Sequence, residues 1–341
     1  MKENENGNIF NVLPLVNSIL AFLIVVHHSF NLNVDYNAPI KNIAWFIERY
    51  FYNLSECSVP VFFFISSLLF YRNYDGSMHI YLYKLKKRFK TLMIPYIIFN
   101  TFGYLKHIIF GSSDKFFSLS NLIKSIVMSD TMPLWFIREL YIFIFLAPII
   151  YLFKKNVKVG LLFSIVCSLL NVFGILKYRS FLYWVPIYLI GVYFSEIKIL
   201  RFNITIKKNT IPTWLFFLIF IFSPLFLPNT TGKMKILGNF MFLLFRLYSV
   251  FVWIYIISSI ESKTIKVKEY MKFSFWIYCV HFPIISLVTI VITKIMYGDS
   301  NFILIIRFIV TICLTFTISL ILGMLIKKIM PKTWKLLNGG R

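Results

Sequence analysis

Long apolar stretches recur along the whole chain, and their length predicts helices that cross a membrane. The stretches run for about 17–25 residues and lack the two-residue alternation of a membrane β-strand. Because only helices and closed barrels satisfy their backbone hydrogen bonds in lipid, we expect an all-α polytopic membrane protein. The ten predicted spans have these approximate limits: 10–30, 56–71, 91–111, 133–153, 158–175, 180–196, 211–229, 237–259, 274–296 and 302–326.

The composition agrees with a membrane protein and changes how the basic charge is interpreted. Hydrophobic residues make up 59% of the chain and charged residues 14%, yet the formal net charge is +23. With a cytoplasmic N-terminus, most Lys and Arg residues fall in segments predicted to be cytoplasmic, as the positive-inside rule requires. We therefore expect both termini in the cytoplasm and attraction to anionic membrane lipids, and no nucleic-acid partner.

The chain is predicted to be a single membrane domain over residues 1–341. Its polar opening, MKENENGNIF, lacks the basic region and the small-residue cleavage site of a removable signal peptide. The four cysteines lie singly in or beside apolar stretches, so neither a metal site nor a disulfide framework is predicted. The Lys-, Ile-, Phe- and Asn-rich composition is typical of bacteria, and we expect a multi-pass protein of a bacterial plasma membrane.

The first span, which contains NSILAFLIVVHHSF, ends in two adjacent histidines. Asn17 and His28 are separated by about 1,100° of helical rotation, which is within ~20° of three full turns. They therefore share one face, whereas His27 points about 100° away. Since a polar ring in lipid is costly unless it is paired or faces water, His28 is predicted to be a site residue and His27 its structural neighbour. Alternatively, both rings mark the membrane interface.

Two further stretches carry carboxylates at the predicted outer ends of spans. In SECSVPVFFFISSLLFYR, Glu56 precedes the aromatic run, and Ser66 and its neighbour lie where small residues let helices approach closely. The alternative is a solvated loop carboxylate with two packing serines. In MPLWFIRELYIF, Arg138 and Glu139 follow Trp135. Adjacent helical residues do not face each other, so each is expected to need its own partner, unless Arg138 simply snorkels beside an interfacial tryptophan.

A fourth stretch, FSFWIYCVHFPI, places His281 three residues after Tyr278 on one helical face. A histidine this deep in an apolar run is expected to face the helix bundle. Arg246 and Arg307 lie within other spans and are candidate counter-charges whose partners the sequence leaves open.

A fifth stretch, YLYKLKKRFKTLMIPY, packs basic residues against the start of the third span, among them Lys86, Lys87 and Arg88. A basic cluster beside a membrane usually binds lipid headgroups, and we favour that interpretation from composition alone. The same cluster could instead bind the phosphates of a cytosolic cofactor.

Taken together, these stretches resemble the acyltransferase-3 family of integral-membrane acyltransferases. NSILAFLIVVHHS resembles its first-span segment of an arginine, ten residues and a histidine, and VPVFFFISSLLF resembles its second-span motif V-P-x-F-F-x-x-S-G. The basic run ending in KKRFKTLMIPY, then PLWFIRELY and FWIYCVHFP, resemble three further family segments in the same order. The likeness extends from about residue 10 to residue 326.

The resemblance implies transfer of an acyl group, usually acetyl, from cytosolic acyl-CoA to a hydroxyl of a surface glycan or lipid-linked sugar. His28 matches the family's essential histidine and would act as general base. Tyr278 and His281 would orient the acyl group or stabilise the oxyanion. The predicted binding residues also include Asn17, Ser66, Lys86, Lys87, Arg88, Trp135 and Arg138. From chemistry alone, Glu56 or Glu139 is suggested to fix the tautomer of the histidine.

Two residues depart from the family pattern. Asn17 occupies the position of the family's arginine, and Ser67 occupies the position of the glycine in the second-span motif. Exchanging a guanidinium for a neutral amide is not conservative. Arg138 or Arg307, from another helix, are candidate replacements for the missing cation.

We therefore predict a membrane O-acetyltransferase that uses acetyl-CoA and no metal, acts on a cell-surface polysaccharide or its lipid-linked precursor, and is compatible with assembly of identical copies. An alternative is a carrier, because the scaffold also resembles the membrane half of bacterial membrane-bound serine racemases. A third hypothesis is a structural subunit without a ligand, which the number of polar residues on inner faces argues against.

Overall fold

The computed structural model describes residues 6–30, 42–110, 117–196, 213–228, 234–260 and 267–340, and these form helices and no strand. The α-helices are α1 Asn6–His28, α2 Ile43–Ser55, α3 Ser58–Tyr71, α4 Met78–Arg88, α5 Ile94–Phe110, α6 Leu119–Met128, α7 Trp135–Phe145, α8 Ala147–Lys155, α9 Val157–Val172, α10 Phe181–Phe194, α12 Thr213–Phe222, α13 Lys235–Ser259, α14 Ser274–Ile295, α15 Asn301–Ile329 and α16 Pro331–Leu337. A π-helical segment, η1 Phe89–Met93, joins α4 to α5, and short 3-10 helices are η2 Ser223–Phe226 and η4 Glu269–Phe273.

The predicted multi-pass, all-helical architecture is confirmed, and each of the ten predicted spans overlaps at least one helix. Residues 111, 211, 212 and 229 of these spans lie outside the described residues. Long, apolar helices that could cross a membrane are Ile43–Tyr71, Met78–Ile109, Lys235–Ser259, Glu269–Ile295 and Asn301–Ile329, and α7 with α8 forms one more candidate, bent by 65°. The other predicted spans fall on shorter helices. Since α10 has 14 residues and a length of about 21 Å, it is shorter than the ~30 Å hydrocarbon core. The number of ten crossings and the orientation of the termini stay predictions.

Two predicted spans begin earlier than expected. The span predicted at 56–71 is the second half of a helix from Ile43, and the span predicted at 91–111 extends back to Met78. In both cases charged residues interrupt the apolar pattern while the backbone stays helical. In the first helix these are Glu48, Arg49 and Glu56.

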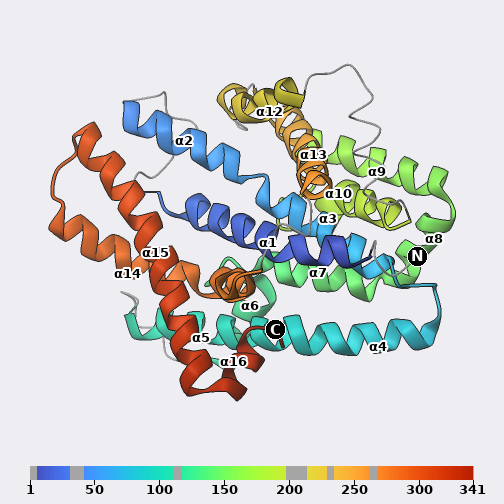
Figure 1. Cartoon of the computed structure of the whole chain (residues 1–341), viewed down its shortest axis with the longest axis horizontal. Helices are drawn as coiled ribbons and strands as arrows, with labels where there is room; N and C mark the ends of the chain where they lie inside the picture. Colours follow the sequence, from blue (N-terminus) through green and yellow to red (C-terminus); the bar gives the residue numbers. More distant parts are fainter. Residues whose placement is uncertain are drawn as a thin grey trace.

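Helix α1 is the centre of the bundle. It contacts α2, α3, α13, α14 and α15, and Figure 1 shows it crossing the middle of the molecule. Around it, α3 packs closely on α10, where a Cβ on Gly191 would overlap the Ser67 hydroxyl and lie 2.5 Å from the Phe64 carbonyl oxygen. This contact shows that Gly191 of α10, packed on Ser67 of α3, allows the close approach of the two helices.

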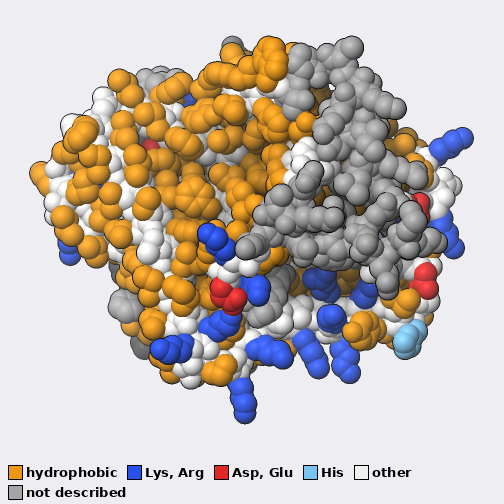
Figure 2. All heavy atoms as spheres, in the orientation of Figure 1, with side chains coloured by type: hydrophobic (Ala, Val, Ile, Leu, Met, Phe, Trp, Pro, Cys, Tyr) orange, Lys and Arg blue, Asp and Glu red, His pale blue; other side chains and the backbone are white. Residues whose placement is uncertain are grey.

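Lys and Arg side chains gather at one end of the bundle, along the lower edge of Figure 2. This basic end includes α4, the end of α15, and α16. Asn338, just after α16, accepts a hydrogen bond from the backbone N–H of Trp276 at 3.1 Å, which fixes the start of α14 at the same end. From there α1 and α14 run side by side in one direction, since Asn17 lies near Ser274 and His28 lies near His281.

Candidate active site

His28 of α1 and His281 of α14 lie together at the far end of their shared contact. Their ring centroids are 5.1 Å apart with an interplanar angle of 34°. His281 is fully buried, and its Nδ1 donates to the Tyr278 carbonyl at 2.7 Å. A neutral His281 therefore carries its proton on Nδ1 and a lone pair on Nε2, and this Nε2 has no hydrogen-bond partner among the described residues.

The His27 ring meets the His28 ring edge to face, with ring centroids 5.0 Å apart, so His27 is part of the same site. Its ring stacks on Tyr52 at a centroid distance of 4.2 Å. The Ser55 hydroxyl donates to the Tyr52 carbonyl at 2.6 Å, so its remaining role is to accept from His27 Nδ1 at 2.9 Å. His27 Nε2 then faces the Glu56 carboxylate at 3.9 Å.

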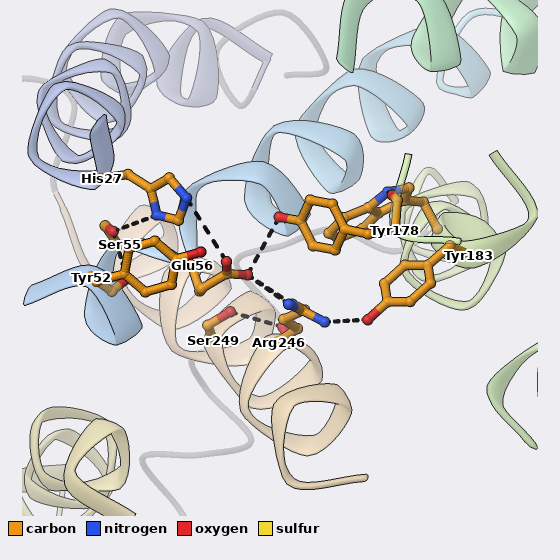
Figure 3. A network of polar contacts seen from close by, with 9 residues as sticks. His27, Tyr52, Ser55, Glu56, Tyr178, Tyr183, Arg246 and Ser249 are labelled. Atoms are coloured by element: carbon orange, nitrogen blue, oxygen red, sulfur yellow. Dashed lines mark hydrogen bonds and ion pairs between the residues drawn. The ribbon is translucent and has the colours of Figure 1, made fainter. Parts of the chain in front are cut away.

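Glu56 lies between His27 and Arg246 in the network of Figure 3. Both Nε and Nη2 of Arg246 donate to Glu56 Oε2, at 3.1 and 2.7 Å, and both side chains are buried. The alternative of a solvated carboxylate at Glu56 is therefore wrong, because the turn between α2 and α3 faces the bundle interior. The counter-charge of Arg246, which the sequence left open, is Glu56.

Two tyrosines complete the network. The hydroxyl of Tyr178, in the connection between α9 and α10, donates to Glu56 Oε2 at 3.3 Å. Burial raises the pKa of the Tyr178 phenol well above its ordinary value, so the phenol keeps its proton. Arg246 also donates to the Tyr183 hydroxyl, and its guanidinium lies 5.0 Å from the ring centroid of Tyr178. Hydrogen bonds and ring contacts thus compensate the burial of both charges.

An outer cavity of about 630 Å³ opens beside this network. Both histidines of α1 line it, so its floor carries two rings able to exchange protons. Its other lining residues are Phe30, Tyr52, Glu56, Pro133, Trp135, Asn171, Gly174, Leu176, Tyr178, Arg179, Tyr183, Lys235, Asn239, Phe242 and Arg246.

An inner cavity of about 100 Å³ lies toward the basic end. Four of its lining residues, Asn17, Ser66, Arg88 and Tyr278, belong to the binding residues predicted from sequence. The rest of the lining is Phe62, Ile65, Leu69, Leu92, Phe136, Ile137, Leu140, Ser274 and Phe275.

A middle cavity of about 60 Å³ adjoins both. It shares Phe136 and Tyr278 with the inner cavity, and it shares His28 and Trp135 with the outer one. The three cavities therefore form a row from Arg88, at the end of α4, to the paired histidines and beyond.

Arg138 and Glu139 do not lie in this row. Arg138 Nε donates to Glu139 Oε1 at 2.6 Å, and its Nη1 and Nη2 donate to the carbonyls of Val127 and Arg179 at 2.6 and 3.0 Å. The expectation that the two residues need separate partners is wrong, because the long arginine side chain folds back to its neighbour's carboxylate. Neither residue lines the three cavities, and Arg138 ties the last turn of α6 to the loop after α9.

Arg88 is the cation that shares a cavity with Asn17, the residue at the position of the family's arginine. Arg307, considered as a replacement, donates instead to backbone carbonyls of Met296 and Gly298 after α14. Arg88 lines the inner cavity with Asn17, whereas Lys86 and Lys87 are exposed on α4. The π-helical turns of η1 follow directly, and they shift the helical register between α4 and α5.

Sequence reasoning missed several residues of the outer cavity, among them Tyr178, Arg179 and Lys235. The first two lie in the segment LKYRS between two apolar runs, where an aromatic beside a cation in a short polar loop was the available signal. Lys235 opens α13 and reads as an ordinary flanking lysine of a membrane helix. Only the fold brings these side chains to the histidines of α1.

Comparison with known proteins agrees with the motifs. One comparison with curated proteins and one with solved structures found no significant match. The sequence profile of the acyltransferase-3 family, described as an acyltransferase domain, matches residues 15–324. This range begins in α1, ends in α15 and contains every residue that lines the row of cavities. The chain thus belongs to the acyltransferase-3 family.

Proposed function

We propose that this multi-pass membrane acyltransferase moves an acetyl group from cytosolic acetyl-CoA to a hydroxyl of a cell-surface polysaccharide or its lipid-linked precursor. The observation that carries the proposal is the row of cavities from Arg88 to His28. A donor that enters at one end and an acceptor that enters at the other would meet at the histidines.

The basic end suits the donor. The positive-inside rule favours a cytoplasmic location for the end that carries α4 and α16. The Arg88 guanidinium has no hydrogen bond or ion pair to the residues that the structure describes, and Arg88 lines the inner cavity. Its planar guanidinium is suited to bind the phosphates of coenzyme A, with Lys86 and Lys87 adding positive charge nearby.

The inner and middle cavities, which lead toward the histidines, suit the flexible arm of acetyl-CoA that carries the thioester. Asn17 and His28 are about 16 Å apart along α1, and the inner cavity between them is lined largely by aromatic and aliphatic side chains. Phe136 and Tyr278 line both the inner and the middle cavity, so they are the side chains that must part to admit the arm.

The chemistry at the histidines is an acyl transfer. His28 takes the proton of the acceptor hydroxyl while the oxygen of that hydroxyl attacks the thioester carbonyl carbon. The tetrahedral intermediate then collapses with cleavage of the C–S bond, and the thiolate of coenzyme A takes up a proton. Neutral His281 has a lone pair on Nε2, so it can accept a proton there but cannot donate a hydrogen bond from this atom to the oxyanion. We therefore assign His281 the role of a proton acceptor beside His28.

The outer cavity suits the acceptor. It is the largest of the three, and it combines aromatic faces with hydrogen-bonding side chains, as saccharide sites do. Trp135 lies 5.1 Å from Tyr178 between ring centroids, so the two rings form one apolar wall beside the histidines.

The direct test uses purified protein reconstituted with an envelope fraction and radiolabelled acetyl-CoA. We expect equal amounts of acetyl group on the glycan and free thiol in solution. The His28→Ala variant is expected to produce neither while still binding acetyl-CoA. Free thiol without acetylated glycan would mean hydrolysis only, and it would contradict the proposed acceptor.

The row of cavities also suits the alternative of a carrier, since it leads from one end of the bundle toward the other. A carrier predicts accumulation of a solute in vesicles that does not depend on acetyl-CoA. It also predicts no thermal stabilisation by acetyl-CoA, which separates it from the transferase.

A further inference from the structure

The outer cavity carries more positive than negative charge. Arg179, Lys235 and Arg246 line it together with one carboxylate, that of Glu56. The ion pair with Arg246 already uses this carboxylate. Two positive charges are therefore left over for whatever fills the cavity.

Arg179 and Lys235 are both available to a ligand. Neither side chain has a hydrogen bond or ion pair within the described part of the chain, and both are exposed at the cavity. The backbone carbonyl of Arg179 accepts a hydrogen bond from Arg138 at 3.0 Å, so the loop that carries this guanidinium is held to α7. On the same loop, Gly174 adopts φ +70°, and a Cβ added there would lie 2.9 Å from Lys235 Nζ. The loop thus runs against the ammonium group, and both cations border the same opening.

A second, independent feature indicates a hydroxyl-bearing ligand. Asn171 is buried and lines the cavity, and its Nδ2 donates to the Tyr183 carbonyl at 2.8 Å. Its Oδ1 has no hydrogen-bond partner among the described residues. A buried acceptor without a partner is costly, and a sugar hydroxyl could donate to it.

We infer that the acceptor in the outer cavity is an anionic saccharide, one that bears a phosphate or carboxylate group. Its charged group binds Arg179 and Lys235, and a ring hydroxyl donates to Asn171 Oδ1. This orients a second hydroxyl toward His28 at the floor of the cavity. The inference rests on the proposed function, because it names the substrate class of the same site.

The test measures binding of three sugars to purified protein in neutral detergent by calorimetric titration. The probes are glucose 1-phosphate, glucuronate and methyl glucoside, which differ in charged group but share the ring. We expect the wild type to bind one or both anionic sugars at least about tenfold more tightly than methyl glucoside, with the difference shrinking at high salt. Preference for the phosphate or for the carboxylate identifies the source of the charge.

The variants are Arg179→Gln, Lys235→Gln and their combination, with Lys177→Gln as control because that exposed lysine does not line the cavity. Each single change is expected to weaken anionic binding about threefold and the pair about tenfold, while methyl glucoside and the control are unaffected. The inference is overturned if methyl glucoside binds as well as the anions, if the double variant keeps the preference, or if no probe binds.

Acetyl-CoA binding by the same samples separates this inference from the proposed function. Intact acetyl-CoA binding together with any of those results overturns the anionic acceptor alone. If the wild-type protein does not bind acetyl-CoA, the acyltransferase proposal itself is overturned.

Discussion

Glu56 and Arg246 form a buried ion pair, 2.7 Å between Oε2 and Nη2, that joins the turn between α2 and α3 to α13. The two residues are 190 positions apart in the sequence, and the Glu56 carboxylate of the pair lies 3.9 Å from His27 Nε2. Any loss of one partner leaves the other as an uncompensated charge in a low-dielectric environment. This relationship links the stability of the bundle to the geometry of the candidate active site.

Removal of one partner should therefore destabilise the protein strongly. Arg246→Ala is expected to cost about 3–5 kcal/mol of unfolding free energy, the range typical of a broken buried pair. The combination Glu56→Gln with Arg246→Met should recover part of that loss. Thermal melting of the purified proteins in detergent measures the stability of both variants.

Glu269→Gln is the matched control for this prediction. Glu269 pairs with Lys272 and Lys327 at an exposed position, so its loss should change stability by less than about 1 kcal/mol. Equal effects of Arg246→Ala and Glu269→Gln would show that the buried pair does not hold the helices together.

His28→Ala should remove acetyl transfer and leave folding intact. Loss of a general base typically lowers the rate by about 10²–10⁴-fold. His79→Ala serves as control, because His79 is exposed on α4 and lines none of the three cavities. Initial rates of thiol release at saturating acetyl-CoA test the prediction, and a wild-type rate in His28→Ala would exclude this histidine as the base.

Arg88 should supply the cation that Asn17 lacks. Arg88→Gln is expected to raise KM for acetyl-CoA about tenfold, and Lys87→Gln less than threefold, because only Arg88 lines the inner cavity. Introducing Asn17→Arg into the Arg88→Gln variant should restore much of the affinity by returning a guanidinium to that cavity. If the double variant binds acetyl-CoA no better than Arg88→Gln, the two positions are not interchangeable.

The contact between α3 and α10 should not tolerate an added methyl group. Gly191→Ala would force a Cβ against Ser67 and the Phe64 carbonyl, at an expected cost of about 1–3 kcal/mol. Gly103→Ala is the control, since its nearest neighbour is the flexible side chain of Met132. Thermal melting of the two variants should give a clearly lower midpoint for Gly191→Ala.

The helices were largely predictable because apolar runs mark buried or lipid-facing segments directly. The helix α2 was not predicted, because Glu48 and Arg49 interrupt its apolar pattern, although it is continuous with α3. Whether a short helix such as α10 crosses the membrane depends on its tilt and neighbours, which composition does not encode.

The site was predictable only where one helix carries the geometry. Helical phase predicts different directions for His27 and His28, but it cannot show that the two rings touch or that His27 faces Glu56. Pairings between distant segments, such as that of Glu56 with Arg246, depend on how the helices pack. The ion pair between Arg138 and Glu139 was missed for a different reason, since its geometry depends on a side-chain conformation and not on helical spacing.

The central claim is that acetyl-CoA enters from the basic end and reacts at His28. The most direct measurement loads acetyl-CoA on one side only of oriented proteoliposomes and compares wild type, Arg88→Gln and His28→Ala for binding and thiol release. The account predicts reaction only when acetyl-CoA is on the side of α4 and α16, weaker binding in Arg88→Gln, and binding without reaction in His28→Ala. Reaction from the opposite side, or undiminished thiol release in His28→Ala, would contradict it.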